Sequence, residues 1–165
     1  MTQAMNDREI RTDRMRYVKN TSSSRLCYLA ILLNVLYFVS IYKSDVGSWY
    51  YQMLVGGSIV YNLLFMLMVF LASEGVKSYQ KNYSWILYLL GILQIARIFI
   101  LPTQAHQAVI KIGSEETAVM QTPQYIRCMI YLAGSAASLI VAALINQRKS
   151  AALAKHIGTI GEGQN

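Results

Sequence analysis

Four long runs of apolar residues constrain this chain more than any other feature. They lie at about 26–42, 51–72, 85–101 and 126–145, and none of them contains an Asp or a Glu. A helix that crosses a bilayer needs about 20 mostly apolar residues, and none of the runs alternates as a barrel strand would. The sequence therefore predicts an all-α membrane protein whose four helices cross the bilayer as a bundle.

The overall composition supports this fold class. The chain has 165 residues, of which 55% are hydrophobic and 14% are charged, whereas soluble domains carry roughly 25% charged residues. We expect membrane lipid to cover the surplus. The predicted organisation is a basic N-terminal arm at 1–25, a transmembrane domain at 26–149 and a tail at 150–165, which leaves no room for a second soluble domain.

The distribution of Lys and Arg predicts the orientation, because positively charged loops resist translocation. With both termini in the cytoplasm, eleven of the basic residues fall inside and three outside, and Arg97 lies within the third apolar run. We therefore expect a multi-pass protein of the plasma (inner) membrane with cytoplasmic termini. The inner residues are Arg8, Arg11, Arg14, Arg16, Lys19, Arg25, Lys77, Lys81, Arg148, Lys149 and Lys155, and the outer ones are Lys43, Lys111 and Arg127.

The longest connection, at 103–124, is predicted to lie outside, between the third and fourth helices. Pro102 precedes it and is a plausible stop for the third helix. Two apolar stretches, at 108–112 and 117–121, flank a turn-forming segment at 113–116. This pattern is typical of a small β-hairpin, although an amphipathic segment resting on the membrane fits it nearly as well.

Most kinds of catalytic chemistry find no support in the sequence. Cys27 and Cys128 are predicted at opposite ends of the bundle, too far apart for a disulfide, and His106 and His156 lie on opposite sides of the membrane. No metal cluster, nucleotide-binding loop or nucleophile with a base can be assembled. We expect no catalytic residues, no metal and no cofactor, and hence no enzyme. Proton-coupled transport is also disfavoured, because it usually depends on an intramembrane carboxylate.

Nucleic-acid binding is disfavoured as well, despite the formal charge of +7. The N-terminal arm carries the largest group of basic residues, and no aromatic stacking platform accompanies it. Anchoring and orienting the chain in the membrane explains this arm better.

Uncharged polar residues occupy the centres of all four apolar runs. Asn34, Asn62, Gln94 and Ser135 are predicted to lie at about the same depth, one on each helix. An unpaired amide is unfavourable in hydrocarbon, so these side chains should face one another. They either form interhelical hydrogen bonds that stabilise the bundle or line a small polar cavity for a substrate or a lipid headgroup.

Arg97 lies three residues after Gln94 and therefore on the same side of the helix. An intramembrane Arg has three alternatives. It can extend to the outer headgroups, bind an anion, or meet a carboxylate of another subunit. The sequence leaves all three open.

Small residues mark faces where helices can pack closely. Gly134 and Ser138 form a small-xxx-small pair on the fourth helix, and Gly56 and Gly57 reduce the bulk of the second helix. The neighbour at these faces can be a helix of the same chain, a second copy or another protein, and packing within the chain is the default expectation.

Two functional hypotheses follow from these features. The first is an accessory, stabilising or regulatory subunit of a larger membrane complex such as a transporter, which would contact other membrane-protein subunits or self-associate. The second is a self-contained carrier or flippase for an anionic small molecule or lipid, using Arg97 and the amides at the centre of the membrane.

Overall fold

The computed structural model describes the backbone of residues 19–41, 49–107, 109–112, 115–118 and 120–162, and the side chains of these residues except in 49–55, 110–118 and 157–162. Most of the predicted N-terminal arm, the connection at 42–48 and the last three residues of the tail lie outside this part of the chain.

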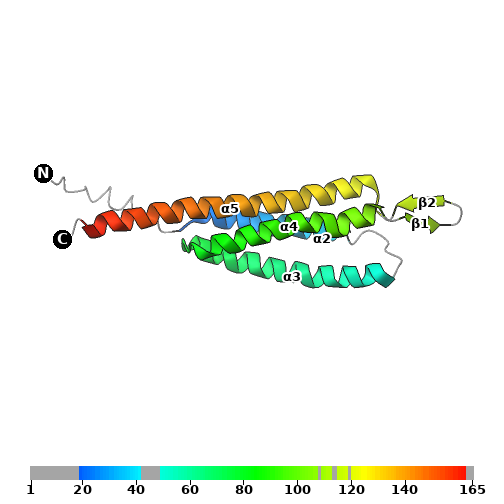
Figure 1. Ribbon diagram of the computed structural model, residues 1–165, viewed down its shortest axis with the longest axis horizontal. Helices are drawn as coiled ribbons and strands as arrows, with labels where there is room; N and C mark the ends of the chain where they lie inside the picture. Colours follow the sequence, from blue (N-terminus) through cyan, green and yellow to red (C-terminus); the bar gives the residue numbers. More distant parts are fainter. Residues whose placement is uncertain (1–18, 42–48, 108, 113–114, 119, 163–165) are drawn as a thin grey trace.

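The described residues form four helices that are long and apolar enough to cross a membrane. These helices are α2 (Thr21–Ile41), α3 (Trp49–Lys77), α4 (Asn82–Gln107) and α5 (Thr122–Glu162). They extend beyond the predicted apolar runs, most of all α5, whose 41 residues correspond to about 60 Å. The hydrocarbon layer is only about 30 Å thick, and the last part of α5 projects past the other helices (Figure 1).

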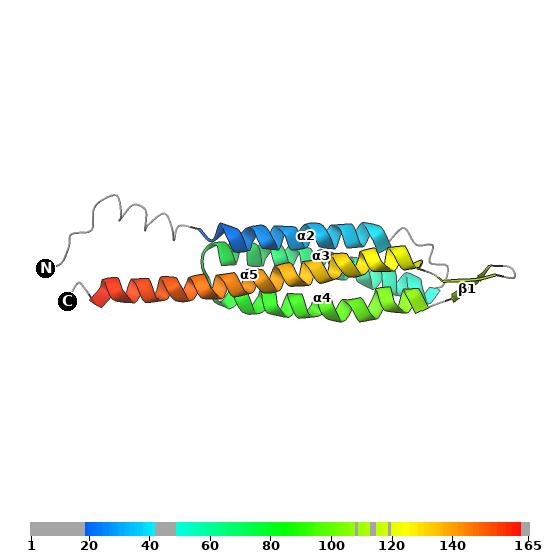
Figure 2. The same cartoon turned by 90° about the horizontal axis from the view of Figure 1, so that it is seen from above.

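Within the bundle, α5 packs against α2 and α4, and α3 packs against the same two helices, so that α3 and α5 lie diagonally across from each other (Figure 2). Two apolar clusters form the core. One contains Cys27, Phe65 and Leu87 and lies toward the turn between α3 and α4. The other contains Ile98 and Cys128 and lies toward the opposite end. Both cysteine thiols are free and buried, as predicted.

The outer surface of the bundle is strongly apolar. More than half of the accessible area is exposed at Leu32, Leu63, Leu67, Phe99 and Ile130. Water would penalise so much exposed apolar area, whereas lipid tails would not. Together with the helix lengths, this surface supports the interpretation of the chain as a multi-pass membrane protein.

Pro102 does not end the third helix, contrary to the prediction. Helix α4 continues through it to Gln107. A proline inside a helix lacks the N–H that would bond to the carbonyl four residues earlier, here that of Ile98. The Thr103 hydroxyl donates to this carbonyl at 2.9 Å and so replaces the missing bond, which is a common way for membrane helices to tolerate proline.

The connection after α4 forms a β-hairpin, which is one of the two predicted arrangements. Strands β1 (Val109–Ile112) and β2 (Glu115–Ala118) pair antiparallel, with Ile112 opposite Glu115. The second strand therefore begins two residues earlier than the predicted stretch. The hairpin projects from one end of the bundle (Figure 1). Hydrogen bonds fix its base, since the Met120 amide donates to the Ala105 carbonyl at 3.2 Å and the Met120 carbonyl lies 3.0 Å from His106 Nδ1.

The opposite end of the bundle contains a tight turn between α3 and α4. The Gln80 amide donates to the Gly75 carbonyl and the Tyr79 amide to the Val76 carbonyl, which is the Schellman arrangement that ends many helices. Tyr79 adopts a positive φ of 59° at the position that usually favours glycine. This turn makes α3 and α4 antiparallel. The end of the bundle that contains it is the turn end.

Candidate functional site: a buried polar layer around Arg97

The predicted polar residues meet in one buried layer between the two apolar clusters. The Asn34 amide nitrogen donates to Asn62 Oδ1 at 3.0 Å, which joins α2 to α3. The Gln94 amide nitrogen donates to Asn34 Oδ1 at 3.1 Å and to the Ser135 hydroxyl at 3.2 Å, which joins α4 to α2 and α5. All four side chains are fully buried. The prediction that they face one another is therefore confirmed by their contacts.

Ser135 also fixes the packing of α5 against α2. Its hydroxyl donates to the Ala30 carbonyl at 3.1 Å while it accepts from Gln94. A serine hydroxyl can do both, because it has one donor and two acceptor positions. Every helix of the bundle thus contributes at least one side chain to the layer.

Arg97 extends into this layer and not toward the headgroups. Only 6% of it is exposed. Its Nη1 donates to Asn62 Oδ1 at 2.8 Å and to Asn34 Oδ1 at 3.2 Å, and its Nη2 donates to the Ser58 hydroxyl at 2.9 Å. Of the three alternatives that the sequence left open, extension to the outer headgroups is not the arrangement that the structure adopts.

Two tyrosine rings enclose the guanidinium group. Its Cζ atom lies 4.5 Å from the centroid of the Tyr37 ring and 4.8 Å from that of Tyr61. A cation over an aromatic face within about 6 Å gains roughly 2 kcal/mol or more where water is absent. The rings therefore replace part of the hydration that Arg97 loses on burial.

The Gln94 carbonyl oxygen Oε1 and the Tyr61 hydroxyl have no hydrogen-bond partner among the described residues. An acceptor and a hydroxyl left in this way are costly in a buried site. Both belong to side chains of the Arg97 layer, so this layer has bonding capacity that the described residues do not use.

The small residues predicted to pack helices divide into two groups. A Cβ atom added to Gly134 would lie 3.1 Å from Leu33 Cδ1, so this glycine sits close to α2, and the buried Ser138 bonds the Gly134 carbonyl at 2.8 Å. Gly56 and Gly57 are different. They are exposed on α3, and an added Cβ would meet no atom of the described residues within 4 Å. Within the described part of the chain these two glycines have no packing neighbour, so the expectation that they pack against another helix stays a prediction.

The sequence did not single out Ser58 as a ligand of Arg97 or the faces of Tyr37 and Tyr61 as its neighbours. Ser58 lies four residues before Asn62, whose amide nitrogen donates to the Ser58 carbonyl at 2.8 Å. This i, i+4 spacing places both side chains on one face of α3, and it was the signal available for Ser58.

A second polar network, also not predicted, lies at the turn end. Asn20 caps α2 through its side-chain oxygen, and its amide nitrogen donates to Asn146 Oδ1 at 3.1 Å. The Asn146 amide nitrogen in turn donates to the Ser84 hydroxyl at 2.8 Å and to the Gln80 carbonyl at 3.1 Å. The network ties α2 and α5 to the turn between α3 and α4. Its groups satisfy one another, so we assign it a structural role.

Metal chemistry has no evident site in the part of the chain that is described, where no three His, Cys, Asp or Glu side chains gather. Comparisons of the chain with protein-family models, with curated proteins and with solved structures found no match. The geometry of the bundle is therefore the basis for any functional conclusion.

Proposed function

We propose that this protein is an accessory, stabilising or regulatory subunit of a larger membrane complex, such as a transporter. The observation that supports the proposal is the open face of α3 at Gly56 and Gly57. Glycine pairs on membrane helices allow another backbone to approach closely, and no atom of the described chain fills the space beside these two. Gly56 and Gly57 directly precede Ser58 in α3, so this face lies at about the same depth as the Arg97 layer.

The interior of the bundle is consistent with such a role. Asn34, Asn62, Gln94 and Ser135 bond mostly to one another and hold the helices together. The outer surface of a bundle stabilised in this way is available to contact a partner helix.

The test is purification of the full-length chain from native membranes in a mild detergent, followed by mass spectrometry of the intact complex. We expect a stoichiometric partner with the wild type and its loss with Gly57→Leu. This substitution has open space at the site, and leucine favours a helix more than glycine does, so folding should not suffer. Ala133→Leu is the matched control, since Ala133 is also small and exposed but lies on α5, diagonally across the bundle. A wild-type chain that purifies alone would refute the proposal.

A second candidate function is a carrier or flippase for an anionic small molecule or lipid. The observation that favours it is the pair of unbonded polar atoms, Gln94 Oε1 and the Tyr61 hydroxyl, in the layer that also holds the Arg97 guanidinium. Tyr61→Phe keeps the ring over Arg97 and removes only the hydroxyl. In liposomes reconstituted with the purified chain, we expect anion or lipid flux that this variant reduces; equal flux in both proteins would exclude a role for the hydroxyl.

The proposed orientation places both termini in the cytoplasm and the hairpin end outside. Its support is the excess of Lys and Arg on the side of the termini and of the connection at 78–81. In this orientation the projecting part of α5 lies in the cytoplasm, and the membrane is the plasma (inner) membrane.

A further inference from the structure

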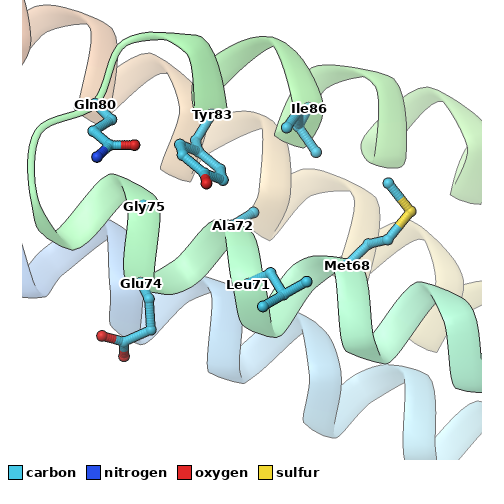
Figure 3. A pocket seen from close by; sticks show the side chains of 8 residues that line it. All are labelled: Met68, Leu71, Ala72, Glu74, Gly75, Gln80, Tyr83 and Ile86. Carbon is cyan, nitrogen blue, oxygen red and sulfur yellow. The ribbon is translucent and has the colours of Figure 1, made fainter.

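A groove lies between α3 and α4, next to the turn that joins them (Figure 3). Its volume is about 400 Å³, within the range of pockets that hold small molecules. The residues that line it have no part in the Arg97 layer or in the network at the turn end, except that the Gln80 carbonyl accepts from Asn146. The groove is therefore a separate feature of the bundle.

The two ends of the groove differ in polarity. Met68, Leu71 and Ile86 line the end of the groove that lies farther from the turn, and Gln80 lies at the end beside the turn (Figure 3). Leu71 is 54% and Met68 42% exposed, so the apolar end is continuous with the lipid-facing surface. An occupant that matches this groove has an apolar chain at one end and a polar group at the other.

Gly75 and Tyr83 give the groove its shape. The Tyr83 ring lies so close to Gly75 that a Cβ atom on residue 75 would overlap the ring. Only glycine allows this approach, and the ring then forms one wall of the groove at the boundary between the apolar and the polar end. The shape of the groove thus depends on a particular sequence feature.

The charges near the turn favour an anionic group. Lys77 ends α3, and Lys81 is exposed and directly follows Gln80 in the turn. Glu74 also lines the groove, and the Lys77 ammonium nitrogen contacts its two carboxylate oxygens at 3.0 and 3.2 Å. Neither lysine lines the groove, but two ammonium groups against one carboxylate leave an excess positive charge in the segment that ends α3 and forms the turn. Basic residues at this level of a membrane protein attract anionic lipids.

We propose that the groove between α3 and α4 binds one anionic phospholipid, with an acyl chain along Met68, Leu71 and Ile86 and the phosphate at Gln80 and Lys81. In the proposed orientation this lipid belongs to the inner leaflet. The site is independent of the accessory role, because it lies on the α4 side of α3 at the turn end, whereas Gly56 and Gly57 lie near the other end of α3.

The test uses the full-length chain in mixed micelles that contain phosphatidylglycerol and phosphatidylcholine in equal amounts, with native mass spectrometry to count the retained lipids. We expect the wild type to retain one phosphatidylglycerol molecule in preference to phosphatidylcholine. Met68→Trp fills the apolar end and should reduce this retention by about tenfold. Leu67→Trp is the matched control, because Leu67 is the next residue, is 54% exposed and does not line the groove.

Two further variants test the same site if Met68→Trp does not fold. Leu71→Trp fills the same groove from its exposed side and should also reduce retention, and Lys81→Gln should abolish the preference for phosphatidylglycerol while changing only an exposed side chain. Equal retention by the wild type, Leu71→Trp and Leu67→Trp would overturn the proposed site. Equal retention of the two lipids by the wild type would overturn the assignment of an anionic lipid.

Discussion

Burial of the Arg97 charge is possible because the surrounding side chains replace its water. Oxygens of Asn34, Asn62 and Ser58 accept its hydrogen bonds, and the rings of Tyr37 and Tyr61 cover the guanidinium group. These partners stabilise the protein only together with the charge. Removing one partner leaves a buried charge that lowers stability, whereas replacing the charge and its partners by apolar residues does not. This coupling can be measured.

We predict that Asn62→Leu destabilises the protein and that Arg97→Leu relieves part of the loss. The first change removes the acceptor at 2.8 Å from Arg97 Nη1 and should cost about 3 kcal/mol, more than a neutral hydrogen bond would. With Arg97→Leu also present, no buried charge remains, so the double variant should be more stable than Asn62→Leu alone by about 1 to 2 kcal/mol. Unfolding in mixed detergent micelles, followed by circular dichroism, measures all three variants, and additive effects would show that the two residues are not coupled.

The sequence predicted the four uncharged polar residues at the centre of the layer, but it predicted neither Ser58 nor the bonds that these residues make. Asn34, Asn62, Gln94 and Ser135 could be placed at one depth because each stands at the centre of an apolar run. The direction of the Arg97 side chain could not be predicted, since a long side chain can extend along or across its helix. The partners Ser58 and Asn62 lie on α3, so the direction depends on how α3 is rotated about its axis. That rotation results from the packing of the whole bundle.

At the scale of elements, the helices are defined by the apolar runs and their ends by local chemistry. A proline is a weak stop signal inside a membrane, because no water competes for the freed carbonyl and a neighbouring hydroxyl can take it. Thr103 performs this role for Ile98 in α4. The hairpin could be anticipated because a turn-forming segment at 113–116 separates two apolar stretches, whereas the first residue of its second strand could not.

We predict that Thr103→Val is harmful only while residue 102 is a proline. Valine keeps the shape of threonine and leaves the Ile98 carbonyl without its donor, which should cost about 1 to 2 kcal/mol of unfolding free energy. In a Pro102→Ala background the alanine N–H can bond to Ile98 directly, so the same change should cost less than about 0.5 kcal/mol. The same unfolding assay compares the four proteins, and an equal loss in both backgrounds would contradict this account of how α4 continues past the proline.

On the scale of the whole molecule, polar networks fix the bundle at two levels. The Arg97 layer joins all the helices between the two apolar clusters, and the Asn20–Asn146 network joins α2 and α5 to the turn. Between these levels, the exposed side chains are largely apolar. The turn-end network escaped prediction because Asn20, which precedes α2, and Asn146, which lies within α5, are 126 residues apart in the sequence, and only the packed bundle brings them together.

The orientation of this bundle has a direct test, because its two ends differ in charge. The turn end carries Lys77, Lys81 and Lys149, and Lys149 donates to Asn20 Oδ1 at 3.2 Å. Translocating this end would require moving several ammonium groups across hydrocarbon, which the insertion machinery resists. We therefore predict that a fluorescent protein fused after Glu162 is fluorescent and that alkaline phosphatase at the same position is inactive. Alkaline phosphatase inserted at the hairpin, between Gly113 and Ser114, should be active. The reverse pattern would place the turn end outside and move the proposed lipid site to the other leaflet.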